Sequence, residues 1–232
     1  TNSSLPPQGY GVVLARDNQL KHLHILDTQN SGIFGGFGAQ PFGGDLVIQS
    51  ILVTGANKSG EIFDPANVIF APSILLGSAD DIDITIKNSD IGEANVSSVL
   101  IYHLDGHADI RINNTIVRDQ GEVLENYEVS PGIGVFATGS SSFDVAVINT
   151  TGHNIGGDIF SNSDGLLLLN AGNGAMTVNV DGYRYSNPDE GGYSGTSTGI
   201  EMGFFGSSGG GSFNGVVTNS VIEDAFAAGI QI

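Results

Sequence analysis

The stretch that decides the fold is DITIKNS at residues 83–89, because the chain repeats it. DIRINNT stands at 109–115 and DVAVINT at 144–150, so each copy reads polar, apolar, any, apolar, any, Asn, then Ser or Thr. Weaker copies occupy 45–50, 177–182 and 214–220. The copies begin 26 to 38 residues apart, and a period in this range indicates an array of stacked structural units.

A second, shorter phrase recurs in phase with the first and consists of a small residue followed by alternating apolar residues. Both phrases have a period of two, which is typical of short strands with one buried face. No stretch combines helical periodicity with helix caps. We therefore expect at least two short strands per repeat, with equivalent strands stacked in parallel. The second phrase lies at 11–14, 32–34, 73–76, 98–101, 132–135, 165–168, 199–202 and 229–232.

Together the two phrases resemble the repeats of right-handed parallel β-helices of the pectin-lyase-like superfamily, and they are similar to the passenger regions of bacterial autotransporters and surface adhesins. The resemblance covers about residue 9 to residue 232 and implies an all-β solenoid of about six to seven coils. The right-handed choice agrees with the general preference of parallel crossovers. The resemblance is specific for the fold and not for an activity, because the repeat encodes the stack.

The repeats predict a single domain over 1–232, in which 1–8 is a lead-in and 9–232 forms the stacked coils. The last strand phrase, at 229–232, runs to the end of the sequence with no capping segment after it. A β-helix exposes unpaired strand edges at its ends, which proteins usually cover. We therefore expect the chain to be a fragment of a longer protein that supplies further coils or a cap.

Composition narrows the classes of partner. The formal net charge is −18 with only seven Lys and Arg, which argues against nucleic acid and anionic membranes as partners because both need a basic surface. There is no cysteine, so disulfides and thiolate metal sites are excluded. No apolar run approaches the ~20 residues of a membrane-spanning helix, so direct membrane insertion is not expected. These features favour an extracellular or bacterial cell-surface location.

Aligning the copies groups the side chains into columns about 4.8 Å apart along the stack. The alternation places Ile84 and Ile86, and their equivalents in other repeats, in the core. The Asn of each phrase has the same parity, so we expect an inward-leaning polar ladder in which amides bond to their neighbours, with a polar binding groove as the alternative. The predicted ladder contains Ser50, Asn88, Asn114, Asn149 and Asn219.

A column of aspartates precedes the first inward residue of four repeats. Like charges at this spacing either raise each other's pKa or recruit a cation, and Ca²⁺ suits ligand sets made only of oxygen. The alternative is that each carboxylate accepts a local backbone N–H within its own turn. The candidate Ca²⁺ ligands are Asp80, Asp81, Asp83, Asp105 and Asp109.

The densest group of titratable side chains lies in YHLDGHADIR at 102–111. His103, Asp105, His107 and Arg111 are the candidate catalytic residues, since a polysaccharide lyase of the resembled fold needs a base and a cation that neutralises its substrate. The alternative is a polar loop between two coils. Further acids for a glycosidase-type cleft stand in two inserts, at Glu122, Glu125, Asp189 and Glu190.

Two classes of function therefore compete. The first is a structural stalk, adhesin or glycan-binding surface, whose partners would be glycans or molecules of a host or cell surface. The second is a polysaccharide lyase or another carbohydrate-active enzyme that acts on acidic or neutral glycans, with Ca²⁺ as its candidate cofactor. The motifs of the polygalacturonase-type hydrolases and alginate epimerases of the resembled fold are absent, so neither activity is assigned directly.

Overall fold

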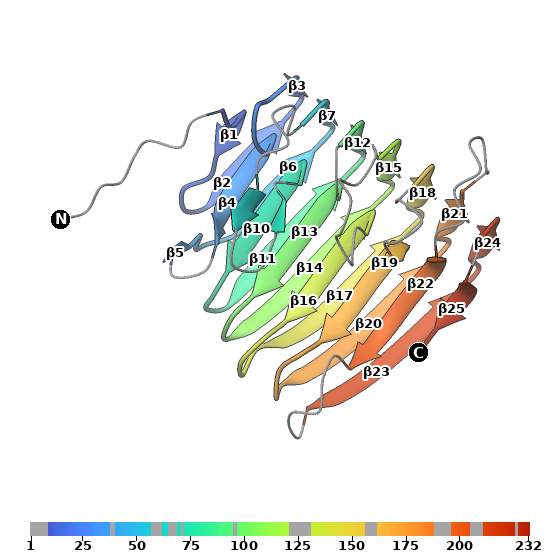
Figure 1. Ribbon diagram of the computed structural model, residues 1–232. Coiled ribbons are helices and arrows are strands. Elements are labelled where there is room, and N and C mark those ends of the chain that lie inside the picture. The colour runs from blue at the N-terminus through green and yellow to red at the C-terminus, as the bar shows by residue number, and fades with distance from the viewer. Residues whose placement is uncertain are drawn as a thin grey trace.

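The computed structural model shows a parallel β-helix built from three long parallel sheets, which we call A, B and C (Figure 1). Colour runs from the blue N-terminal turn to the red C-terminal turn along one axis. No helix occurs in the part of the chain that is described, and accordingly none that could cross a membrane. The described residues are 9–37, 40–56, 62–64, 69–70, 72–94, 97–120, 131–155, 162–187, 196–204, 211–225 and 227–232.

Each turn passes through sheet B, then sheet C, then sheet A, and every strand pairs with its equivalent in the neighbouring turns. Sheet B consists of β2 (Asn18–Lys21), β6 (Leu46–Gln49), β11 (Ile82–Lys87), β14 (His107–Asn113), β17 (Ser142–Ile148), β20 (Ala175–Asp181) and β23 (Ser212–Thr218). Sheet C, along the upper edge of Figure 1, consists of β3 (His24–Leu26), β7 (Leu52–Thr54), β12 (Asp90–Gly92), β15 (Ile116–Arg118), β18 (Thr151–His153), β21 (Arg184–Ser186) and β24 (Val221–Glu223).

Sheet A completes the cross-section. It contains β1 (Val12–Val13), β4 (Ile33–Phe37), β10 (Ile74–Ser78), β13 (Val99–His103), β16 (Ile133–Ala137), β19 (Asn162–Asn170), β22 (Thr196–Phe204) and β25 (Ala228–Gln231), and β5 (Gln40–Pro41) pairs with β4 in the antiparallel sense. A separate antiparallel pair joins β8 (Ile62–Asp64) to β9 (Ile69–Phe70). The expected parallel stacking is confirmed, but each turn carries a third short strand, in sheet C, that the two repeated phrases did not reveal.

The core consists of apolar columns that face inward from all three sheets. In sheet B, Ile84 pairs with Ile110 and Ile86 with Ile112, and all four side chains are fully buried. Sheet C contributes one inward residue per strand, such as Val53, because its strands have only three residues. Burial of this apolar surface, at roughly 25 cal/mol per Å², is the main favourable term for the stack.

The corner between sheets C and A is occupied by small residues, which explains the second repeated phrase. A Cβ atom on Gly32 would collide with Val53, and a Cβ atom on Gly199 would collide with Ile222. The inward side chain of sheet C therefore uses the space that a larger corner residue would need. At Gly165 the same space receives the buried rings of Tyr183 and Tyr185.

The corner between sheets B and C is set by a residue in the left-handed backbone region. Its φ is 51° at Asn88, 49° at Asn114 and 48° at Asn149. Asn and Gly adopt this region at lower cost than other residues, which explains the Asn of the first phrase. The corner N–H groups continue the sheet ladder, since Asn88 donates to the Asn113 carbonyl at 3.0 Å. The equivalent residues in the other turns are His22, Ser50, Gly182 and Asn219.

Four of the seven corner residues are followed by a Ser or Thr that has a structural role of its own. Its side chain points inward, and the hydroxyl donates to the carbonyl two residues earlier, at 2.9 Å from Ser89 to Lys87 and 3.0 Å from Thr115 to Asn113. Thr150 and Ser220 repeat this contact. These carbonyls already accept the corner N–H of the preceding turn, so the hydroxyl adds a second bond to each of them. The bond also satisfies the hydroxyl itself, which would cost about 1–3 kcal/mol if it were buried without a partner. The left-handed residue shifts the parity of the chain, so this Ser or Thr, and not the Asn, faces the core.

The corner can be tested at Asn149. Replacement by Ala should lower the free energy of unfolding by about 1–2 kcal/mol, because a Cβ-bearing residue without a local polar group is strained in the left-handed region. Asn149→Gly should cost clearly less, since Gly adopts positive φ freely, as Gly182 does one turn later. Denaturant titration of both variants measures the difference. Equal losses for Ala and Gly would contradict the strain argument.

Candidate functional site

A shallow groove of about 400 Å³ follows the corner between sheets B and C across neighbouring turns. Sheet C contributes the outward side chains of successive strands, and the left-handed corner contributes hydroxyl and amide groups. Neighbouring turns stack in register, so equivalent groups recur along the groove at the strand spacing of about 4.8 Å. The lining residues are His24, Ser50, Ile51, Leu52, Asn88, Ser89, Asp90, Asn114 and Ile116.

The amides of the groove are presented to solvent. Asn88 and Asn114 are both exposed, and Asn114 Nδ2 donates to Asn88 Oδ1 at 3.3 Å. One step of the expected ladder is therefore present, but the expectation that the ladder leans inward is wrong, because the left-handed backbone turns these side chains outward. Among the other predicted members, Asn219 donates to Asp181 at 2.7 Å, while Asn149 is exposed and Ser50 is half-buried at the same corner.

The one carboxylate that lines the groove is neutralised by an arginine. Asp90 accepts from Arg118 Nε at 2.9 Å and from Arg118 Nη2 at 3.3 Å, in a bidentate arrangement that favours charge-assisted bonds. Arg118 Nη1 also donates to Asp119 at 2.7 Å, and hydrogen bonding to Asp119 raises the pKa of Arg118. Partial burial acts to raise the pKa of Asp119, but bonds from Arg118 and Asn154 bring it below its ordinary value. Arg118 is therefore shared by two carboxylates, both of which are hydrogen-bonded, and the groove floor is polar.

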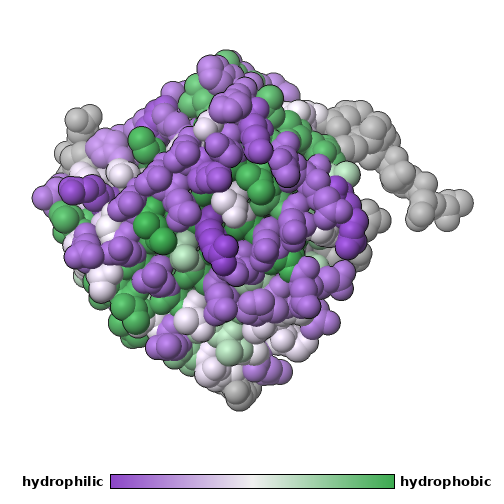
Figure 2. Space-filling model, turned by 180° about the vertical axis from the view of Figure 1, so that it is seen from behind, coloured by the Kyte–Doolittle hydropathy of each residue, from purple (hydrophilic) through white to green (hydrophobic). Residues whose placement is uncertain are grey.

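The apolar part of the groove comes from sheet C. Ile116 is 42 % exposed and Leu52 is half-buried, and the two lie two strands apart with Asp90 between them. Figure 2 shows the side of the molecule opposite to Figure 1 as mostly hydrophilic, with hydrophobic residues in separate small patches. A polar edge beside a small apolar platform suits a sugar ring, which offers both hydroxyl groups and C–H faces.

The predicted catalytic residues do not converge on one site. His103 is fully buried, with Nδ1 2.9 Å from Ser78 Oγ and its ring edge-on to Phe143, and burial lowers its pKa. Asp105 is exposed and accepts from the Ser140 hydroxyl at 2.6 Å, which lowers the pKa of Asp105. The polar-loop alternative therefore describes Asp105, whereas His103 belongs to the core.

His107 and Arg111 instead lie on the outer face of sheet B. Arg111 pairs with Asp109 at 2.6 Å. His107 Nδ1 lies 2.9 Å from Ser142 Oγ, and its Nε2 lies 3.6 Å from Asp144 Oδ2. A hydroxyl, an imidazole and a carboxylate thus lie in sequence, an arrangement that sequence reasoning missed because Ser142 is 35 residues from His107.

Three of the five predicted Ca²⁺ ligands are engaged by other groups: Asp81 accepts the backbone N–H of His107 at 3.0 Å, Asp105 accepts from Ser140, and Asp109 pairs with Arg111. In the column of aspartates, Asp45 accepts the backbone N–H of Asp83 at 3.2 Å. This donor belongs to the neighbouring turn, so the expectation of bonding within each turn is wrong for Asp45. No group of three or more His, Cys, Asp or Glu in the described ranges could hold a metal ion, and Asp80, Asp81, Asp83, Asp105 and Asp109 are not brought into such a group.

A buried polar cluster lies at the start of the sheet A strands β19 and β22. Asp164 is 2 % exposed, and burial together with the neighbouring Glu201 raises its pKa to about 7, against the opposing effect of hydrogen bonds from Thr198. Within the described residues neither Asp164 Oδ1 nor the Tyr183 hydroxyl has a hydrogen-bond partner. Below about pH 7 the Asp164 carboxyl is protonated, which removes the cost of burying a charge there.

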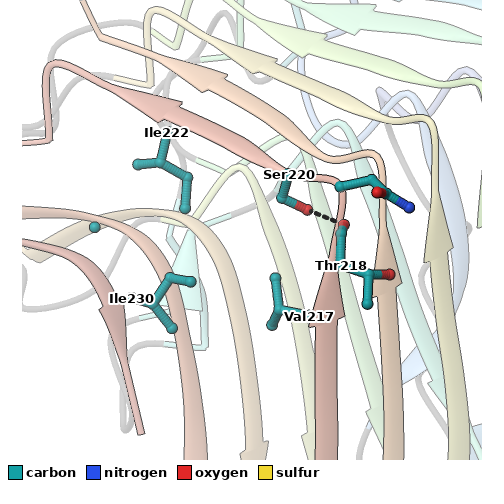
Figure 3. Close-up of a pocket in the computed structure, with 7 residues that line it drawn as sticks. Val217, Thr218, Ser220, Ile222 and Ile230 are labelled. Carbon is teal, nitrogen blue, oxygen red and sulfur yellow. Dashed lines mark hydrogen bonds between the residues drawn. The ribbon is translucent and has the colours of Figure 1, made fainter.

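One further hollow is apolar. A hollow of about 390 Å³ lies inside the last described turn, where Val217, Ile222 and Ile230 each represent one sheet (Figure 3). It continues the apolar columns of the core, and the dashed line in Figure 3 marks the Ser220 hydroxyl bond to Thr218.

The four acids proposed for a glycosidase cleft, Glu122, Glu125, Asp189 and Glu190, lie outside the described residues.

Comparison of the chain with protein-family models, with curated proteins and with solved structures finds no match. The fold and the groove are therefore the observations from which function is argued.

Asp164 provides a test that depends on pH. Its pKa rises from an ordinary 3.8 to about 7 in the folded state, so its contribution to stability is full below about pH 4 and is lost as pH rises through 7. Asp164→Asn removes that dependence. The melting temperature of the variant relative to wild type should rise between pH 5 and pH 8, by the equivalent of at most about 4 kcal/mol. A pH-independent difference would contradict a buried, protonated Asp164.

Proposed function

We propose that the protein is an extracellular or cell-surface β-helical module that binds glycans at the groove between sheets B and C. The observation that carries the proposal is the recurrence of outward amide and hydroxyl groups, at Ser50, Asn88 and Asn114, beside the apolar side chains of Leu52 and Ile116. Amides donate and accept at once, as the hydroxyl groups of sugars require. The rigid stack supports these groups on a regular scaffold.

The parallel β-helix and the composition support the rest of this proposal. The fold is the one that the resemblance to pectin-lyase-like proteins and to autotransporter passengers implies, and the absence of cysteine together with the net charge of −18 suits an exposed, secreted stalk or adhesin. Binding is favoured over a lyase activity because His103 is buried in the core, Asp105 is bonded to Ser140 and Arg111 is paired with Asp109.

Binding can be measured with the purified chain and a panel of neutral and acidic polysaccharides, followed by affinity electrophoresis and calorimetry. Asn88→Gly should weaken binding about 2- to 10-fold, the equivalent of one lost hydrogen bond, without straining the corner. Asn149→Gly is the matched control, since this residue has the same backbone conformation outside the groove. Equal affinities for wild type and Asn88→Gly would contradict this site. Unsaturated products or new reducing ends would favour a lyase or hydrolase instead.

A second candidate function rests on Ser142, His107 and Asp144. Nδ1 of His107 is placed to take the Ser142 proton, and Asp144 Oδ2, 3.6 Å from the other ring nitrogen, is near enough to stabilise the imidazolium that would form. Ser142 Oγ would attack an ester carbonyl, and its proton would pass through His107 to the departing alkoxide. Water would then release the acyl group. This arrangement would suit a carbohydrate esterase, one of the carbohydrate-active classes open from the sequence.

The esterase candidate is tested by covalent labelling with a fluorophosphonate probe and by hydrolysis of p-nitrophenyl acetate. Wild type should be labelled at Ser142, and His107→Gln should lower the rate by about 100-fold or more because the general base is lost. Ser140→Ala, a neighbouring hydroxyl bonded to Asp105, should remain labelled. Labelling that persists in Ser142→Ala, or no labelling of wild type, would rule this function out.

A further inference from the structure

We propose that the groove takes an extended, neutral β-1,4-linked glycan that lies along the axis of the β-helix, with one sugar residue against each turn. This inference rests on the proposed glycan-binding function and specifies its ligand. The groove runs across turns and not along one strand, since its sheet C residues His24, Leu52, Asp90 and Ile116 are register partners in four consecutive strands.

The spacing of the binding groups argues for this direction. Strands in a sheet lie about 4.7–4.9 Å apart, and the pairings Leu52–Asp90 and Asp90–Ile116 are in register, with no bulge between them. The length of one sugar residue in an extended 1,4-linked chain is close to this spacing. A glycan along the axis therefore meets the equivalent positions of one turn at each residue, whereas a glycan across the axis would leave the groove after one turn.

The chemistry of the corner suits both edges of such a glycan. Successive sugar residues of a β-1,4-linked chain are flipped relative to each other, so they present opposite ring edges to the protein. Each turn of the β-helix must therefore bind different hydroxyl and ether oxygens from those that its neighbour binds. The Asn88 and Asn114 side chains each carry donor and acceptor atoms, and the Ser50 hydroxyl can donate or accept. Ile116, 42 % exposed, offers an apolar surface for the C–H face of a ring.

The charge of the groove selects a neutral glycan. Among the described lining residues the only carboxylate, Asp90, is held in two hydrogen bonds by Arg118, so neither charge is free to pair with a ligand. None of these described residues is a Lys or an Arg. The chain as a whole carries a net charge of −18, which repels a polyanion that no cation of the groove would hold. A polyuronate therefore gains no compensating contact in the groove.

The experiment measures the affinity of the full chain for cello-oligosaccharides from the disaccharide to the hexasaccharide by calorimetry. Each added residue should raise the affinity about 2- to 10-fold up to the tetrasaccharide, which spans the four turns of the groove, and longer chains should bind no more tightly per site. Malto-oligosaccharides of the same lengths, whose α-linkages curve the chain, should show no such progression.

A variant separates this geometry from simple glycan binding. Asn114→Gly should weaken tetrasaccharide binding about 2- to 10-fold, yet change disaccharide binding by less than about twofold, because a disaccharide can occupy the turns of Ser50 and Asn88 instead. Asn149→Gly should leave both unchanged. Affinity that does not depend on length, or equal losses for both ligands in Asn114→Gly, would overturn the axial arrangement alone. Absence of binding at every length would overturn the proposed function with it.

Discussion

Every turn of this β-helix depends on a single residue with positive φ between sheets B and C. The sheet B strand and the sheet C strand are separated by only two residues, of which this is the first, and its own N–H group still donates to the neighbouring turn. Where the second is a Ser or Thr, its hydroxyl adds a bond to the carbonyl two residues earlier. Because the ladder is never interrupted, neighbouring turns have no freedom to slip in register, and a slip of one residue would turn the whole inward face outward.

Much of the fold was predictable from the sequence for a simple reason. The strands of sheet B are long enough for their alternation to be visible, so the period of two was sufficient to assign the inward column of Ile84, Ile110 and their equivalents. The strands of sheet C could not be found in this way. With three residues each they show one inward side chain, such as Val53, and a single residue has no period.

The candidate site was less predictable, because its residues come from different turns and meet only when the turns stack. Alternation alone gave Asn88 the parity of a core residue. The left-handed backbone reverses this parity, and its only mark in the sequence is the recurring Asn, which is replaced by Gly at 182. The sequence also did not show which way the two histidines face: His103 lies in the core, and His107, four residues later, lies on the outer face. Ser142 contacts His107 because β14 and β17 pair in register. The two residues are far apart in the sequence, so this contact could not be predicted from it.

The parallel ladder also has a mechanical consequence. Strands stack along the axis, so the hydrogen bonds between turns run nearly parallel to it, and each turn is bonded only to its neighbours. Tension applied between the two ends would therefore load these bonds along their own direction and peel the stack one turn at a time. The force needed would be set by the weakest pair of turns and would not increase with length. For a tether at a surface, adding turns would extend reach without adding strength.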